Sequence, residues 1–322
     1  MSFQSQCTLQ ISLAPSDYKH AKHLLPHQIS LLGTQVDEIL LTVDTRRSKG
    51  RFGESWDENA ENLNNMLLNL KRKYAHIRVE NVSYDEGTRN NISRFFFKEG
   101  IIPDKDFRGG PFYAYFFGLY KASNPYVFHL DSDMFLGGRN DKWIKEALEL
   151  YEKTKNLFIV SPLPGPPHPN EELIDQNIIE KLGSYSFQLQ GMSTRVFLIK
   201  KDFFINNKLS LQKPSLRNQI KAVVEGNSNA DLPENIILSF MHEHKMKRID
   251  FLGTDTGLYT LHPPFRTDDF YAKIPDLLQR IESGNLPFPQ LGFYDIVDEL
   301  VDWSSAREKL KHNRWWKRML KA

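Results

Sequence analysis

The segment that most constrains this chain runs from Pro125 to Gly138 and reads PYVFHLDSDMFLGG. Its apolar, β-prone first half predicts a buried strand, which ends abruptly at Asp131 and Asp133 before a Gly-Gly turn. Because alternate residues of an extended chain point the same way, the two carboxylates can converge on one cation while Ser132 points aside. The pattern therefore indicates a functional site, although two solvated turn residues are the plain alternative.

A hard divalent cation suits this pair of aspartates. Mg2+ and Mn2+ accept carboxylate oxygens and keep other positions free for phosphate oxygens. Such an ion neutralises the charge of a departing diphosphate. We therefore expect Mn2+ or Mg2+ as the cofactor, bound beside a diphosphate.

Composition limits the class of protein. The chain has 322 residues, of which 40% are hydrophobic, enough to bury one large α/β core or a core with an appendage. The net charge of +2 predicts no nucleic-acid partner. Cys7 is the single cysteine, which excludes an internal disulfide framework and favours a reducing compartment. Because we find neither a signal-peptide pattern nor an apolar run of membrane-spanning length, we expect a cytoplasmic protein.

The first fifty residues follow the pattern of a nucleotide-binding α/β unit. We expect a strand over 8–13, a helix from Tyr18 to Leu32, and a second strand over 36–43 that ends at Asp44. The chain has no G-x-G-x-x-G or P-loop motif, which argues against a dinucleotide or ATP-type cradle. Asp44 is thus a candidate ligand contact, with a simple turn residue as an equal alternative.

Two later segments have special backbone chemistry. Gly109 and Gly110 precede a predicted aromatic helix over 112–120, and their free N–H groups can face an anion. This makes Arg108 a candidate diphosphate contact, although it can equally pack over the aromatic helix. The segment Ser161–Pro169 is rich in proline and predicts an irregular loop after a strand over 157–160.

A second acidic cluster opens a predicted helix over 231–241. Asp231 and Glu234 are three residues apart with Pro233 between them, which predicts a capping box. A capped helix start is also rigid enough to carry a catalytic carboxylate. Both interpretations can hold together.

Taken in chain order, these motifs resemble glycosyltransferases of the A-type (GT-A) fold, especially the family-2 enzymes and the polypeptide N-acetylgalactosaminyltransferases. The resemblance rests on the strand that ends in Asp131-Ser132-Asp133 and on the downstream segment His262-Pro-Pro-Phe-Arg266. It implies an α/β protein with a mixed, mainly parallel sheet between helices. It also implies a catalytic domain over residues 1–266, followed by a C-terminal helical appendage over 267–322.

The resemblance also implies a donor site for a nucleotide diphosphate sugar, either a UDP-sugar or a GDP-sugar. Its metal would be held by Asp131, Asp133 and His262. A proline turn after the first strand and an aspartate after the second would seat the nucleoside, an arginine would meet the diphosphate, and a glycine would let the sugar approach the backbone. The implied donor-binding residues are Ala14, Pro15, Ser16, Asp44, Arg108, Asp131, Ser132, Gln190, Gly191 and Arg266.

The catalytic residues are less fixed by the resemblance. Family-2 enzymes carry a Glu-Asp pair whose second acid is taken as the base, but this chain has Asn235 in that place. A Glu-Asn pair is instead similar to the retaining N-acetylgalactosaminyltransferases. The catalytic candidates are Glu234, Asp231 and Asp255, and the choice between retention and inversion stays open.

The sequence thus predicts a metal-dependent glycosyltransferase, a hexosyltransferase, acting on an acceptor hydroxyl of a carbohydrate or another molecule. One alternative is a sugar-phosphate nucleotidyltransferase, although Ala14-Pro15-Ser16-Asp17 lacks the expected glycine-rich basic loop. Another is a non-catalytic sugar-nucleotide-binding protein of the same fold. The basic tail from Arg307, with Trp315 and Trp316, predicts contact with an anionic membrane or a partner, or packing on its own domain.

Overall fold

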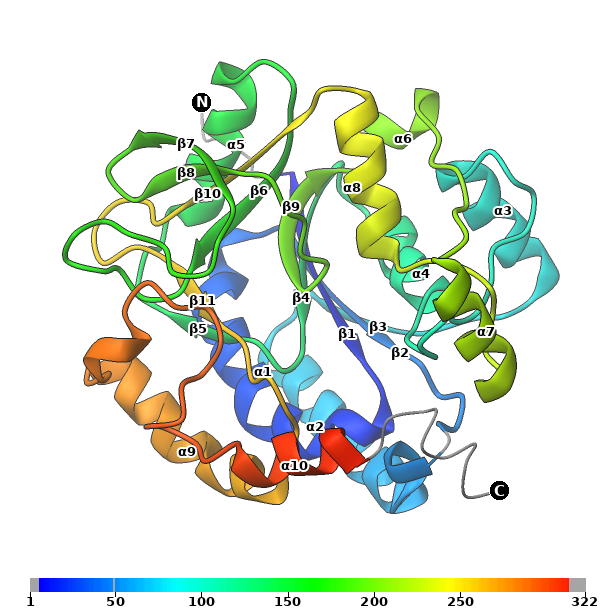
Figure 1. Ribbon diagram of the computed structural model, residues 1–322, viewed down its shortest axis with the longest axis horizontal. Coiled ribbons are helices and arrows are strands. Elements are labelled where there is room, and N and C mark those ends of the chain that lie inside the picture. Colours follow the sequence, from blue (N-terminus) through cyan, green and yellow to red (C-terminus); the bar gives the residue numbers. More distant parts are fainter. Residues whose placement is uncertain (1–5, 49, 313–322) are drawn as a thin grey trace.

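An 11-stranded sheet lies between helices in the computed structural model, which describes residues 6–48 and 50–312 (Figure 1). The main path of the sheet has the order β3-β2-β1-β4-β9-β6-β10-β8-β7, and β11 pairs with β6 and β5. The strands are β1 (Cys7–Leu13), β2 (Glu38–Val43), β3 (Ile77–Asn81), β4 (Tyr126–Asp131), β5 (Phe135–Gly137), β6 (Leu157–Pro164), β7 (Ile178–Gly183), β8 (Ser186–Leu189), β9 (Val196–Lys200), β10 (Lys247–Phe251) and β11 (Tyr259–Leu261).

Helices cover both faces of this sheet. They are α1 (Tyr18–Leu32), α2 (Trp56–Lys73), α3 (Glu86–Phe96), α4 (Tyr113–Lys121), α5 (Trp143–Lys153), α6 (Phe203–Asn206), α7 (Leu216–Glu225), α8 (Pro233–Glu243), α9 (Asp268–Ser283) and α10 (Ser304–His312). One hydrophobic cluster joins α1, α2 and α5 to the sheet, and a second joins α3, α4, α6 and α8. The chain therefore folds as the sequence predicts, as an α/β protein with helices on both sides of the sheet.

The strand directions make the sheet mixed but mainly parallel. β1 pairs in parallel with β2 and β4, and β2 pairs in parallel with β3. β9 is inserted antiparallel between β4 and β6, while β6 and β10 are again parallel. The chain leaves β1 toward β2 and β3 on one side and returns to β4 on the other. This reversal between β1 and β4 is where open α/β sheets bind ligands, at the carboxyl ends of the strands.

The proline-rich segment after residue 160 differs from the prediction. Instead of an irregular loop from Ser161, β6 continues to Pro164. Proline removes a backbone donor, but here the neighbouring residues supply the hydrogen bonds. The N–H groups of Leu163 and Gly165 donate to the carbonyl oxygens of Leu258 and Thr260. Because Pro162 and Pro164 alternate with these donors, the prolines do not interrupt this part of the strand.

The C-terminal segment packs closely on the rest of the chain. Phe270, Ile274 and Trp303 share a hydrophobic cluster with Phe135 and Leu163. The domain boundary at residue 266 stays a prediction. Trp315 and Trp316, with the rest of the tail after His312, lie outside the described residues. Within the described ranges, none of the helices combines the length and apolar character needed to cross a bilayer.

Candidate active site

Helix α1 holds the turn that follows β4. The side-chain amide of Gln28 donates to the carbonyl oxygens of Asp131, at 3.2 Å, and Met134, at 2.8 Å. His20 Nε2 lies 3.0 Å from the hydroxyl oxygen of Ser132, which is buried. Because β4 ends at Asp131, Ser132 and Asp133 belong to the turn, and strand alternation does not set their directions. The turn is a fixed structure, clamped at three points by one helix.

Asp133 is a buried carboxylate that is paired with an arginine. The residue is 2% exposed, which excludes a solvated turn residue. Its Oδ2 accepts hydrogen bonds from Arg266 Nε, at 3.0 Å, and Nη2, at 2.7 Å. Burial raises the pKa of Asp133, but the positive charges around it, led by Arg266, lower the pKa more, so it lies well below its usual range. Asp133 is therefore ionised at neutral pH.

Arg266 joins this turn to the segment after β1. Its Nη1 donates to Asp17 Oδ1 at 2.9 Å, and Asp17 Oδ2 accepts from the backbone N–H of Ala14 at 2.8 Å. Burial raises the pKa of Asp17 even though Arg266 opposes the shift. The predicted contacts Ala14, Pro15 and Ser16 therefore lie beside the Asp133 turn, at the reversal point of the sheet.

Asp131 is more open than Asp133 and is supported from within the sheet. Its side chain is 34% exposed, and its Oδ1 lies 3.3 Å from His129 Nε2. On the other side of the imidazole, His129 Nδ1 contacts Gln10 Oε1, and Gln10 Nε2 donates to Thr42 at 2.9 Å. This buried polar chain crosses β2, β1 and β4. It orients Asp131 and leaves part of the carboxylate accessible.

One arginine near these carboxylates was not predicted. Arg195 precedes β9, and its backbone carbonyl accepts from the Asp131 N–H at 2.7 Å. Burial lowers the pKa of its guanidinium, but Asp133 and Asp131 more than offset this, so the net shift is upward. The charges of both aspartates thus act on Arg195, whose backbone is bonded to Asp131. Its position depends on the β4–β9 pairing, which local patterns do not reveal.

A buried ion pair supports the neighbouring loop. Arg248 Nε and Nη2 donate to the two carboxylate oxygens of Asp250 at 2.7 and 2.6 Å, and its Nη1 donates to the Gly191 carbonyl oxygen at 3.1 Å. Residues two apart on a strand share a face, so the Arg-Ile-Asp pattern could have indicated this pair. A Cβ added at Gly191 would meet no described atom within 4 Å, so there is open space beside the backbone. That a sugar takes this space stays a prediction.

Glu234 brings a third carboxylate to the cluster from the start of α8. Burial raises the pKa of its carboxyl, although the charge of Arg195 opposes the shift. The buried hydroxyl of Tyr115 has no hydrogen-bond partner among the described residues. Burial, and then the charges of Asp131 and Glu234, raise the pKa of Tyr115 well above its usual value. Asp131 and Glu234 therefore act on one buried hydroxyl, which the sequence did not indicate.

The predicted capping box at α8 does not form. Leu232 is the N-cap residue and has no side-chain cap. Asp231 Oδ1 instead accepts from the Leu232 N–H and from the Asn235 side chain, each at 2.8 Å. Asp231 is therefore bonded to Asn235, whereas the prediction paired it with Glu234. The charges that act on Glu234 are those of arginines, led by Arg195.

Asp44 lies at a separate polar platform at the end of β2. Its Oδ2 accepts from the Tyr84 hydroxyl at 2.9 Å, and its Oδ1 accepts from the Arg46 N–H at 3.0 Å. The Arg46 guanidinium lies 3.3 Å from the centroid of the Tyr84 ring and pairs with Asp104 at 2.5 Å. The platform offers a carboxylate beside a flat, stacked surface.

The Gly-Gly segment before α4 differs from the prediction. The N–H of Gly109 donates to the Asp106 carbonyl oxygen at 3.0 Å, and the N–H of Gly110 donates to the Asp106 carboxylate at 2.9 Å. Both N–H groups are therefore already hydrogen-bonded within the loop and are not free to bind an anion. Arg108 is exposed, and its guanidinium lies 5.2 Å from the centroid of the Phe107 ring.

The predicted metal ligands are not assembled into a site. His262 Nδ1 lies 2.7 Å from Asp295 Oδ1, a contact that often orients a metal-binding imidazole. Asp133 Oδ1 is buried and has no partner among the described residues, whereas Oδ2 is taken by Arg266. Within residues 6–48 and 50–312, however, no three His, Cys, Asp or Glu side chains are grouped so as to hold a metal. A metal held by Asp131, Asp133 and His262 therefore stays a prediction.

Asp255 lies in an exposed turn with a φ of 57°. Its neighbour Thr254 bonds to Glu146 of α5, with a backbone N–H···O distance of 3.1 Å. No contact described for the structured part of the chain joins Asp255 to the aspartates after β4. The predicted catalytic residue Asp255 thus has no described contact with Asp131 or Asp133.

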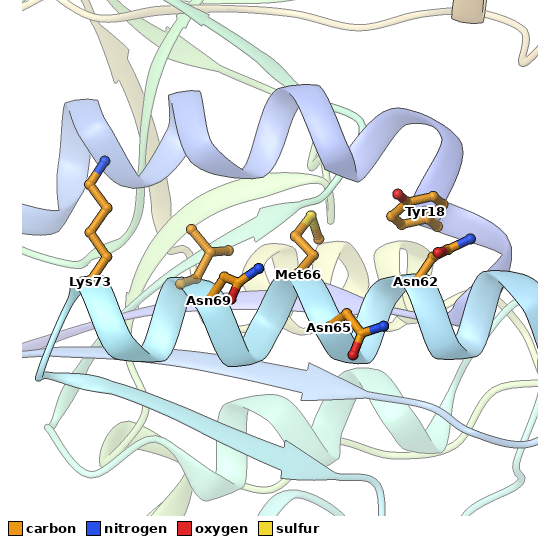
Figure 2. A pocket seen from close by; sticks show the side chains of 7 residues that line it. Tyr18, Asn62, Asn65, Met66, Asn69 and Lys73 are labelled. Carbon is orange, nitrogen blue, oxygen red and sulfur yellow. The ribbon is translucent and has the colours of Figure 1, made fainter.

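Two surface hollows lie outside this cluster. One, of 380 Å³, lies between α1 and α2, where Tyr18 faces a row of side chains that includes Asn62, Asn65 and Asn69 (Figure 2). The other, of 610 Å³, is lined by the C-terminal halves of α1 and α9 and by the β5–β11 pair. Neither is lined by a predicted site residue. The candidate active site is thus defined by its buried charges.

Comparisons with known proteins give only weak matches. No protein-family model and no curated protein matches the sequence. The structure of Staphylococcus aureus TarS 1-349 in complex with UDP-GlcNAc aligns with a TM-score of 0.40 at 11% identity, covering 84% of this chain and 65% of that chain. Another structure of TarS 1-349 gives 0.36 at 12% identity, covering 79% and 59%. A mannose-1-phosphate geranyltransferase from Thermus thermophilus gives 0.36 at 16% identity, covering 76% and 74%.

This chain therefore spans less than two thirds of those two TarS chains. TM-scores this low decide neither fold nor activity, so the function has to be inferred from the residues of this chain.

Proposed function

We propose that this protein is a glycosyltransferase of the A-type fold that transfers a sugar from a nucleotide diphosphate sugar to an acceptor hydroxyl. The observation that carries the proposal is the buried Asp133–Arg266 contact beside Asp131, near the reversal point of the sheet, with Arg195 and Glu234 near enough for their charges to influence one another. A diphosphate is bound by fixed guanidinium groups, and an acceptor hydroxyl is activated by a nearby carboxylate. Both kinds of group meet here.

The residues divide into three roles. Asp44 and the segment from Ala14 to Ser16 would seat the nucleoside beside the Tyr84 ring. Arg266 and Arg195 would bind the diphosphate and stabilise the negative charge that develops as the sugar leaves. Glu234 would orient the sugar or accept the proton of the acceptor hydroxyl, and its raised pKa brings it closer to the working pH of a general base.

A divalent metal remains a prediction, with Asp131, Asp133 and His262 as the ligands to be tested. None of the roles above depends on it. The cytoplasmic location and the choice of a hexose donor are likewise predictions from the sequence.

The decisive experiment measures donor binding and sugar transfer separately. UDP-, GDP-, TDP- and CDP-sugars are added to the full chain, each with Mn2+, with Mg2+ or with chelator, and the melting temperature is recorded. We expect one nucleotide class to raise it, because a ligand at a hundredfold excess over its dissociation constant adds roughly 3 kcal/mol of stability. Transfer to an acceptor panel is then followed by release of the nucleoside diphosphate.

Two variants at the start of α8 serve as a matched pair. Glu234→Gln should keep donor binding and slow transfer by about 100-fold, as expected for loss of a general base. Asp231→Asn, whose carboxylate is already bonded to Asn235, should slow it far less. Pyrophosphate release from a nucleoside triphosphate and a sugar phosphate would instead identify a nucleotidyltransferase. Donor binding without any transfer would identify a non-catalytic binding protein.

A further inference from the structure

Helix α7 has its apolar face turned toward solvent. Leu216, Ile220, Val223 and Val224 follow helical i, i+4, i+7, i+8 spacing, and they are 78%, 56%, 75% and 49% exposed. The opposite side carries the buried Ala222 and the half-buried Asn218 and Glu225. An amphipathic helix of a globular domain normally buries its apolar stripe. In α7 the orientation is reversed, which marks an interaction surface.

The residues around this stripe carry positive charge. From Phe203 to Val224 the chain contains Lys208, Lys213, Arg217 and Lys221 and no acidic residue. Lys221 pairs with Glu225 at 3.8 Å and Lys208 donates to the Phe95 carbonyl oxygen at 2.7 Å, so Lys213 and Arg217 are the cations that matter for a partner. Lys213 and Arg217 are exposed at the N-terminal part of the helix. Figure 1 shows α7 at the margin of the helices that cover this face of the sheet. The surface is thus apolar along one helix and cationic beside it.

An apolar stripe beside cationic side chains favours some binding partners over others. In a symmetric dimer the same patch faces its own copy, which would bring the exposed cations Lys213 and Arg217 of both chains into one interface. A membrane with anionic headgroups accepts the apolar side chains and neutralises the cations at the same time. We propose that α7, with the exposed Lys213 and Arg217 beside its apolar stripe, docks this protein onto the surface of an anionic membrane. This proposal is independent of the glycosyltransferase activity.

Sedimentation with lipid vesicles tests the proposal on the full chain. One set of vesicles is phosphatidylcholine alone, and the other contains half as much phosphatidylserine as phosphatidylcholine. We expect the protein to sediment with the second set and not the first, and to dissociate as salt is raised, because exposed charges are screened. Replacing Ile220 and Val223 together by Glu should weaken binding by at least about 10-fold, since the apolar contact is lost and the added negative charges are repelled by the anionic lipids.

Two control variants keep the interpretation specific. Leu68→Glu alters an exposed apolar residue on α2 and should leave vesicle binding unchanged. Lys213→Glu with Arg217→Glu should abolish the preference for phosphatidylserine, whereas Lys71→Glu with Arg72→Glu on α2 should not. Binding that survives Ile220→Glu with Val223→Glu would move the contact elsewhere, for example to the basic C-terminal tail, and overturn the proposal. So would absence of binding, or a dimer in sedimentation velocity that this double variant dissociates.

Discussion

Asp133 and Asp44 both follow strands at the same edge of the sheet, yet their surroundings differ. Asp133 is buried, and its partner Arg266 is charged and shared with Asp17. Asp44 is half-buried, and its partners are a tyrosine hydroxyl and a backbone N–H. A buried charge must be compensated by another charge, whereas a partly solvated one can exchange neutral partners for a ligand. Asp133 is therefore part of the framework as well as of the site.

The strongest test of this difference is the stability of Asp133→Ala. The substitution leaves Arg266 without one of its two carboxylates, and breaking a buried pair in this way costs about 3 kcal/mol. Urea unfolding of the variant should show that loss, with an unchanged slope. Asp131→Ala in the same turn is the control and should cost less than about 1 kcal/mol, because Asp131 is partly exposed. Equal midpoints for Asp133→Ala and the unaltered protein would contradict our interpretation of the Asp133–Arg266 pair.

A smaller effect is expected from pH, through His20 beneath the Asp133 turn. Burial, followed by the charge of Arg266, lowers the pKa of His20 to about 3, from an ordinary value near 6.5. Between these values the unfolded chain binds a proton that the native chain does not, so the free energy of unfolding falls as pH falls. From pH 6.5 to 5 the loss is about 1.6 kcal/mol.

Urea unfolding at both pH values, repeated with His20→Gln, isolates this contribution. The variant should lose less stability over that interval, because it has no imidazole to protonate. An identical pH dependence in the two proteins would show that His20 titrates normally.

The smallest effect is expected at Asp44. Asp44→Asn should weaken donor binding about 10-fold, equivalent to about 1.4 kcal/mol, while the urea midpoint stays the same. Calorimetric titration with the donor found in the binding panel measures the affinity. Unchanged affinity would remove Asp44 from the nucleoside site, and a lowered urea midpoint would make it a framework residue like Asp133.

Local sequence patterns predicted the strands and helices of the first half well, because each is encoded by its own periodicity and end signals. The strand that ends at Asp131 and the helix from Tyr18 to Leu32 are examples. The side-chain partners were harder to predict because they depend on strand register and on contacts far apart in sequence. Arg195 and the Arg248–Asp250 pair reach the site in this way. The end of β6 was mispredicted at Pro162 for a related reason. A proline has no backbone N–H, but this interrupts a strand only where the neighbouring strand needs that hydrogen bond.

The Asp17–Arg266–Asp133 linkage also bears on the order of folding. Arg266 lies 249 residues after Asp17 and 133 residues after Asp133. While the chain is being synthesised, β1 and β4 are complete long before their arginine has emerged from the ribosome. Burying Asp133 at that stage would strand an uncompensated charge, so the edge of the young sheet has to remain hydrated. The site can therefore close only after Arg266 has been synthesised, which makes its assembly a late step in folding.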